Sequence, residues 1–126
     1  VTYLEKWFDF NRRQVELEAI LEQTIADQSD QSLTLKEFYL LHFLNQAQEK
    51  SLRQIDLPDK LHLSPSAVSR MVARLEEKNC GLLSRRCCDQ DKRASFICLT
   101  SEGQTTLAYL QKAVEESLET KADWLF

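Results

Sequence analysis

Glycine and proline are scarce in this chain of 126 residues. Only two of each occur, namely Gly81, Gly103, Pro58 and Pro65. Sandwiches and barrels need many tight turns, and such turns depend on glycine and proline. We therefore expect a mostly helical fold with long helices and few turns. The length suits one compact domain and is too short for two ordinary ones.

The first stretch, residues 2–27, has apolar side chains at a mostly helical spacing, which predicts one long helix. Its aromatic content exceeds what one stripe against a small core requires. Two interpretations stay open: ordinary core packing, or a surface that a partner subunit or a ligand covers. The aromatic residues concerned are Tyr3, Trp7, Phe8 and Phe10.

The segment that follows the polar linker DQSDQS is typical of a helix start. Thr34 suits the N-cap, and Glu37 stands at the third helical position. Leu33 and Phe38 flank these positions as a hydrophobic staple would. The helix that follows is apolar nearly all round, which indicates a place at the centre of a domain.

Residues 52–63 favour a short helix, because apolar side chains recur at intervals that suit one. Pro58 would remove a backbone hydrogen bond from the interior of such a helix. We therefore expect the helix to begin near Asp56 or Leu57, which places the proline in its first turn.

The clearest local signal is the stretch HLSPSAVSRMVARLEEKN. Ser64 suits an N-cap and Pro65 the first helical position, so a helix is predicted from Pro65 to about Lys78. One face is apolar, while the other carries hydroxyls and arginines with no acid before Glu76. Such a face suits contact with bases and phosphates, although an ordinary solvated helix has the same pattern.

Two short strands, Leu82–Arg86 and Ala94–Leu99, are predicted after this helix, with a charged turn between them. A hairpin that presents Lys92 and Arg93 directly after such a helix is typical of a wing that reaches a narrow DNA groove. The net charge of −4 does not exclude DNA binding. Residues 64–103 hold seven basic and five acidic side chains, and DNA responds to the local field.

Residues 34–103 resemble the winged-helix core of the MarR family of bacterial regulators. Three motifs carry the resemblance in the order that the family has them. LSPSAVSRMVARLEEK resembles the recognition helix, Asp91-Lys92-Arg93 the Asp-x-Arg of the wing, and Leu99-Thr100-Ser101-Glu102-Gly103 the Leu-Thr-x-x-Gly that starts the next helix. After Gly103 the chain has room for one helix, where the family usually has two.

The resemblance implies which residues contact DNA. Ser66, Ala67, Ser69 and Arg70 would face the major groove, and Arg93 would enter the minor groove, held by Asp91. The complete set of predicted DNA contacts is Ser64, Ser66, Ala67, Ser69, Arg70, Arg74, Arg86, Lys92 and Arg93.

The predicted architecture is a mainly α fold with a small β-hairpin wing, that is, a winged helix-turn-helix with dimerisation helices at both ends. Residues 1–33 would form the first dimerisation helix and a linker, residues 34–100 the DNA-binding region, and residues 101–126 the second dimerisation helix. The apolar end, Trp124-Leu125-Phe126, either packs into a partner subunit or marks a chain that stops short of its natural terminus.

The predicted function is that of a bacterial, cytoplasmic transcription regulator, with repression or activation left open. It would bind a pseudo-palindromic duplex as a homodimer and, as the resemblance implies, respond to a small ligand or a redox change. No apolar run is long enough to span a membrane, so no membrane partner is predicted.

Four cysteines, Cys80, Cys87, Cys88 and Cys98, lie too close together for a disulfide framework. Cys87 and Cys88 are candidate redox sensors, because the basic residues nearby favour a thiolate. The alternative is that both are small hairpin residues without a role. Cys98 reads as a buried apolar residue.

No metal, cofactor or enzymatic activity is predicted. The cysteines lack the spaced pairs of a zinc site and His42 and His62 are isolated, although a cross-chain site that uses His42 stays open. No catalytic motif is present. Two rival functions remain: a winged-helix protein-interaction module that does not bind DNA, and a thiol redox protein.

Overall fold

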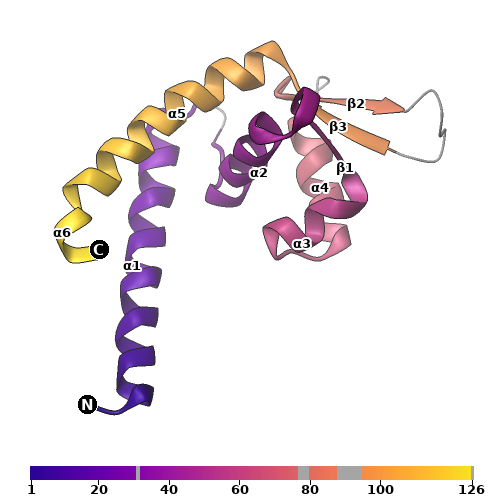
Figure 1. Ribbon diagram of the computed structural model, residues 1–126. Helices are drawn as coiled ribbons and strands as arrows, with labels where there is room; N and C mark the ends of the chain where they lie inside the picture. The colour runs from indigo at the N-terminus through magenta and orange to yellow at the C-terminus, as the bar shows by residue number, and fades with distance from the viewer. Residues whose placement is uncertain (31, 77–79, 88–94, 126) are drawn as a thin grey trace. The chain divides into compact units, whose positions relative to one another are not determined.

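The computed structural model describes residues 1–30, 32–76, 80–87 and 95–125. Its contacts divide the chain into two compact units (Figure 1). The first unit combines Val1–Leu35 with Leu110–Phe126, and the second comprises Lys36–Tyr109. No helix among the described residues is long and apolar enough to cross a membrane.

The first unit contains the long helix that the sequence predicts, α1 (Tyr3–Gln28). Thr2 caps it: its side chain accepts a hydrogen bond from the Glu5 backbone amide, and the Glu5 carboxylate accepts one from the Thr2 amide. Only Leu21 and Ile25 of this helix are buried.

Two helices at the C-terminal end complete the first unit, where the sequence analysis expected one. They are α5 (Ser101–Thr120), which enters this unit at Leu110, and α6 (Ala122–Leu125). The hydroxyls of Thr24 and Ser117 lie 2.9 Å apart and join α1 to α5. The described turn at Lys121, whose amide bonds to the Leu118 carbonyl, separates α6 from α5.

The second unit holds the helices and strands on which the sequence signals fall. In chain order they are α2 (Leu35–Gln46), the 3-10 turn η1 (Gln48–Lys50), β1 (Ser51–Arg53), the 3-10 turn η2 (Gln54–Asp56), α3 (Leu57–Leu61), α4 (Pro65–Leu75), β2 (Leu83–Cys87) and β3 (Ser95–Leu99).

Helix α2 is the central element that its apolar sequence predicts, because its leucines at 40, 41 and 44 are fully buried. Its first amide, on Leu35, donates to the Glu22 carboxylate at 2.6 Å. Helix α3 begins at Leu57 with Pro58 in its first turn, so the expected start is confirmed. His62 ends α3 in the left-handed conformation, with φ of 55°.

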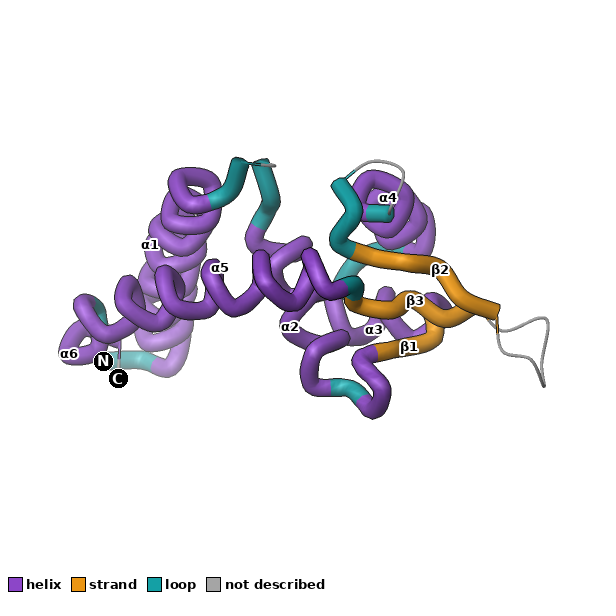
Figure 2. The backbone as a smooth tube through the Cα atoms, turned by 90° about the horizontal axis from the view of Figure 1, so that it is seen from above, coloured by secondary structure: helices purple, strands orange, loops and turns teal. Residues whose placement is uncertain are grey.

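The two predicted strands form the hairpin β2–β3, which with its connecting residues 88–94 we call the wing. The structure adds a third strand that the sequence analysis missed: β1 pairs with the other edge of β3, which gives an antiparallel sheet of order β1-β3-β2 (Figure 2). Ser51 lies opposite Cys98, and Cys87 lies opposite Ser95.

Helix α4 begins at Pro65 behind its Ser64 cap, as predicted, but the expected extent to about Lys78 is wrong. It ends at Leu75, and Glu76 is already extended. The cause is tertiary, because the Leu75 carbonyl accepts a hydrogen bond from the amide of Leu82, at 3.0 Å, instead of continuing the helix.

The core of the second unit lies between α4, α2, α3 and the sheet. Val68 and Val72, the apolar stripe of α4, are buried, as the amphipathic pattern predicts. The other buried apolar side chains of this unit include Leu57, Leu61, Leu75, Leu82, Leu83, Ile97, Leu99 and Leu107.

Thr100 closes the base of the wing and caps α5. Its hydroxyl donates to the Gly81 carbonyl at 2.7 Å and accepts from the Gly103 amide at 3.0 Å. A Cβ on Gly103 would lie 2.3 Å from the Leu82 carbonyl oxygen, so only glycine allows α5 to start this close to the strand. This close contact explains why the Leu-Thr-x-x-Gly motif ends in glycine.

Candidate nucleic-acid interface

The exposed face of α4 brings together most of the residues predicted from the sequence. Ser66, Ser69 and Arg70 are exposed, and Ala67 is half-buried beside them. The first turn of the helix holds no acidic residue. Because the N-terminus of a helix favours negative charge, this turn suits a phosphate or an electron-rich base edge.

Ser64 fixes the start of this face. Its hydroxyl accepts a hydrogen bond from the Ala67 amide at 3.2 Å and lies 3.3 Å from the Ser66 hydroxyl. The cap therefore defines the position of the first exposed turn, where the small side chains leave room for an approaching surface.

Arg74, on the last turn of α4, is engaged inside the protein. Its Nε donates to Oε2 of Glu37 at 2.8 Å, and its Nη2 donates to Oε1 at 2.6 Å. Glu37 is the one charged residue that is buried in the part of the chain that the structure describes, at 3% exposure. The hydrogen bonds to Glu37 raise the pKa of Arg74, so the guanidinium keeps its proton.

A second set of polar contacts joins the middle of α4 to the wing. Arg85 of β2 contacts Glu76 with Nε, at 2.9 Å, and with Nη2, at 2.6 Å. Its Nη1 donates to Oε1 of Gln54 at 2.7 Å, and Nε2 of Gln54 donates to the Ser69 hydroxyl at 3.2 Å. We call these four residues the Ser69 relay.

The remaining predicted residues lie on or beyond β2. Arg86 and Cys87 belong to this strand, but their side chains are outside the described part of the structure. The described residues do not include Cys88, Asp91, Lys92 and Arg93, so their predicted roles stay predictions. Cys98 is buried in β3, and Cys80 is a partly exposed thiol outside any disulfide.

Gln54, Arg85 and Glu37 are the residues of this region that sequence reasoning missed. Glu37 carried only a helix-capping signal, and Arg85 stood as one of several basic residues in a predicted strand. Gln54 carried no signal at all. Their contacts depend on the tertiary fold, which no local spacing in the sequence reveals.

The described residues contain no group of three or more histidine, cysteine or acidic side chains that could hold a metal ion. Beside α4 lies a hollow of about 350 Å³, lined in part by Ile55, Pro58, Pro65 and Val68. The polar edge of this hollow includes Gln54 and Ser69 of the Ser69 relay. The surface is thus a recess with apolar and polar lining next to an exposed helix.

Comparison with protein families matches residues 33–95, from the start of α2 into the wing, to the MarR family. The chain belongs to the MarR family. The predicted winged helix-turn-helix fold is therefore confirmed, and the MarR family comprises transcription regulators. No curated protein sequence matches the chain.

Solved structures of MarR regulators share the fold. Sco3205 of Streptomyces coelicolor, solved in complex with DNA, is 25% identical with a TM-score of 0.82, over 95% of this chain and 74% of Sco3205. AbsC of the same organism is 24% identical with a TM-score of 0.81, over 98% and 78% of the two chains. MepR of Staphylococcus aureus, a regulator of a multidrug efflux pump, is 23% identical with a TM-score of 0.78, over 100% and 86%.

Proposed function

We propose that this chain regulates transcription as a homodimer that binds a pseudo-palindromic duplex, with α4 in the major groove and the wing against the adjacent minor groove. The observation that carries the proposal is the surface of α4. Ser66, Ser69 and Arg70 are exposed together on a helix whose first turn holds no acid. Hydroxyl and guanidinium groups are the donors that read base edges and phosphates.

Each predicted contact has a role in this proposal. Ser66, Ala67, Ser69 and Arg70 would read the major groove, and Arg93, held by Asp91, would enter the minor groove. Ser64, Arg86 and Lys92 would contact the backbone. Arg74 would act mainly by positioning α4, because its guanidinium already forms an ion pair with Glu37.

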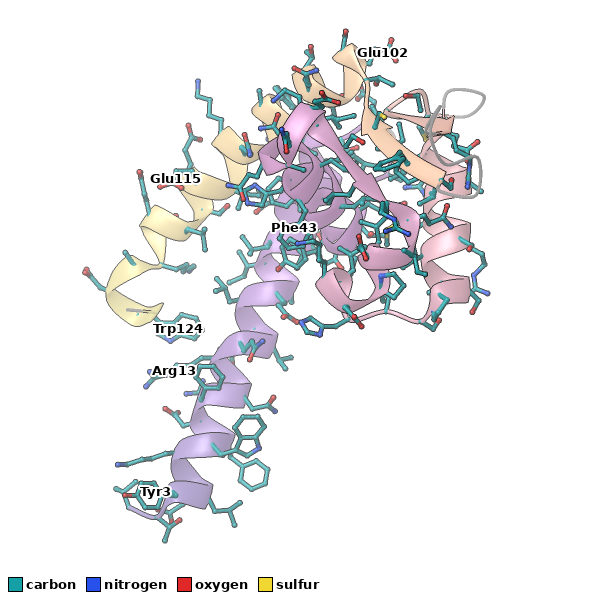
Figure 3. All side chains as sticks on the ribbon, turned by 45° about the vertical axis from the view of Figure 1, so that its right-hand side comes forward. Tyr3, Arg13, Phe43, Glu102, Glu115 and Trp124 are labelled. Carbon is teal, nitrogen blue, oxygen red and sulfur yellow. The ribbon has the colours of Figure 1, made fainter. Side chains whose placement is uncertain are left out.

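The exposed aromatic residues of α1 support a homodimer. Tyr3 extends from the start of α1 and is 87% exposed (Figure 3). Trp7, Phe8 and Phe10 are each more than half exposed, so packing within this chain does not account for them. A second copy would cover this surface, and the homodimer would bind successive major grooves with its two α4 helices, about 10 base pairs apart.

Regulation would come from a ligand or an oxidation that favours one spacing of the two recognition helices over another. A shift of a few kcal/mol in relative affinity is enough to change the population of the DNA-binding state.

Selection from a pool of random duplexes tests the DNA-binding part. We expect enrichment of a two-fold symmetric sequence, with strong loss of retention for Arg70→Ala. Lys112→Ala is the matched control, because Lys112 is an exposed cation on α5 outside the second unit, and this variant should behave as the native chain. A protein-interaction module or a thiol redox protein would enrich no sequence.

Sedimentation tests the homodimer. At micromolar concentration we expect about twice the chain mass of 14.7 kDa. A monomer under these conditions would contradict the proposed arrangement on two half-sites.

A further inference from the structure

The four residues of the Ser69 relay come from η2, α4, β2 and the segment that follows α4. Glu76 holds the Nε and Nη2 side of the Arg85 guanidinium, which leaves Nη1 directed at Gln54. Gln54 is half-buried beneath the exposed face of α4, and it lies next to Ser69. The relay thus runs from the base of the wing to the middle of the helix.

The direction of each hydrogen bond follows from the chemistry of the groups. A guanidinium has donors only, so the atom of Gln54 that faces Arg85 must be the carbonyl oxygen. The amide nitrogen then faces Ser69, and it can only donate. The Ser69 oxygen is therefore an acceptor toward Gln54. No described residue accepts the hydroxyl hydrogen of Ser69, which is exposed.

We infer that Gln54 is a positioning residue that makes Ser69 a hydrogen-bond donor toward DNA. This inference rests on the proposed function. Opposite Ser69 we then expect the DNA to present an acceptor: N7 or O6 of guanine, N7 of adenine, O4 of thymine, or a phosphate oxygen. The exocyclic amines of cytosine and adenine are less favoured there, because Gln54 already occupies one of the two lone pairs of the Ser69 oxygen.

The contacts of the Ser69 relay are suited to orienting the Ser69 hydroxyl and contribute little to the stability of the fold. The Arg85 and Glu76 side chains are 41% and 26% exposed, and ion pairs at such positions contribute little to folding. Loss of Gln54 should therefore change which groups on DNA are preferred while it leaves thermal unfolding close to that of the native chain.

Atom-level changes in the selected duplex test this inference. Each probe removes one acceptor. 7-Deazapurines remove N7, and 2-aminopurine in place of guanine removes O6. Thymine analogues that lack O4 remove that acceptor, and methylphosphonates remove a phosphate acceptor. We expect one such change per half-site to weaken the native chain about three- to ten-fold and to leave Ser69→Ala unaffected. A base probe identifies a base edge as the acceptor, and a methylphosphonate identifies a phosphate.

Gln54→Met removes the amide at similar length and should reduce that loss, because the Ser69 hydroxyl is then free to rotate and both of its lone pairs can accept from DNA. In a Ser69→Ala background, Gln54→Met should have no further effect, since Gln54 acts through Ser69. Gln104→Met, at an exposed glutamine on α5, is the control for the substitution itself.

The outcomes separate this inference from the proposed function. If the native chain selects no duplex, both are overturned. If it selects a duplex but Gln54→Met keeps the native response to every probe, or weakens binding equally in both Ser69 backgrounds, only the role of Gln54 is overturned. Thermal unfolding of each variant identifies a loss that comes from misfolding.

Discussion

Arg74 of α4 and Glu37 of α2 form a two-point ion pair across the second unit, with N–O distances of 2.8 Å and 2.6 Å. The carboxylate is buried, while the Arg74 side chain keeps 41% of its exposure. The pair holds the end of the proposed recognition helix against the central helix. Two parallel contacts fix the angle of the guanidinium as well as its position.

Glu37→Ala should destabilise the protein by about 1–3 kcal/mol, because it leaves Arg74 without its main partner. An arginine stays protonated in proteins, so Arg74 cannot escape this cost by losing its proton. The cost stays below that of a fully buried pair, since water reaches the arginine. Chemical denaturation measures the change in the free energy of unfolding.

Glu16→Ala provides the comparison. Glu16 pairs with Arg12 on the exposed surface of α1, at 3.3 Å, where solvent screens the interaction. This variant should unfold as the native chain does. Equal stability of both variants would show that the Arg74 pair contributes nothing to the fold.

Gly103→Ala should also destabilise the protein, by about 1–3 kcal/mol, because a new methyl group would force the chain apart. It would lie 2.3 Å from the Leu82 carbonyl oxygen and 2.6 Å from Cδ1 of Leu99. Thermal unfolding measures the effect. Gln104→Ala, one residue on and exposed, should be neutral or slightly stabilising. An unchanged melting temperature for Gly103→Ala would mean that α5 can move away from the wing.

Arg70→Ala and Arg93→Ala should change DNA binding in different ways. Arg70→Ala should cost about 1–3 kcal/mol on the selected site and relax the preference at the base that Arg70 contacts. Arg93→Ala should weaken binding evenly across major-groove variants and lower the salt slope by about one unit per lost contact. Affinities for one panel of duplexes at several salt concentrations test both. The reverse pattern would reverse the assignment of helix and wing to the two grooves.

Oxidation of Cys87 and Cys88 should weaken DNA binding, because new negative charge on the wing would repel phosphate. The test compares peroxide treatment of the native chain with that of a Cys87→Ser, Cys88→Ser variant. Cys98 is buried in β3, so its reaction should be slower and should not account for an early loss. The same loss in the variant would exclude both wing thiols as the cause.

Local signals in the sequence explain why much of the second unit is predictable. Ser64 and Pro65 mark the start of α4, and the helical repeat assigns Val68 to the core and Arg70 to the surface. β1 has only three residues, so it carries no period of its own and becomes a strand only by pairing with β3. The end of α4 likewise depends on the distant amide of Leu82.

The polar contacts of the candidate interface could not be predicted in this way. Gln54 and Ser69 are 15 residues apart, and Glu37 and Arg74 are 37 apart. Helical spacing shows that Ser69 is exposed, but it does not show what orients its hydroxyl. Pairs at such separations become visible only when the fold brings their elements together.

The central place of β3 in the sheet also governs how this unit folds. β2 is close to β3 along the chain and can pair with it early, whereas the Ser51–Cys98 pairing closes a loop that contains all of α3 and α4. Closing a long loop has an entropic cost, which packing of the enclosed helices must offset. We therefore expect the outer strand β1 to pair late, after α3 and α4 have packed.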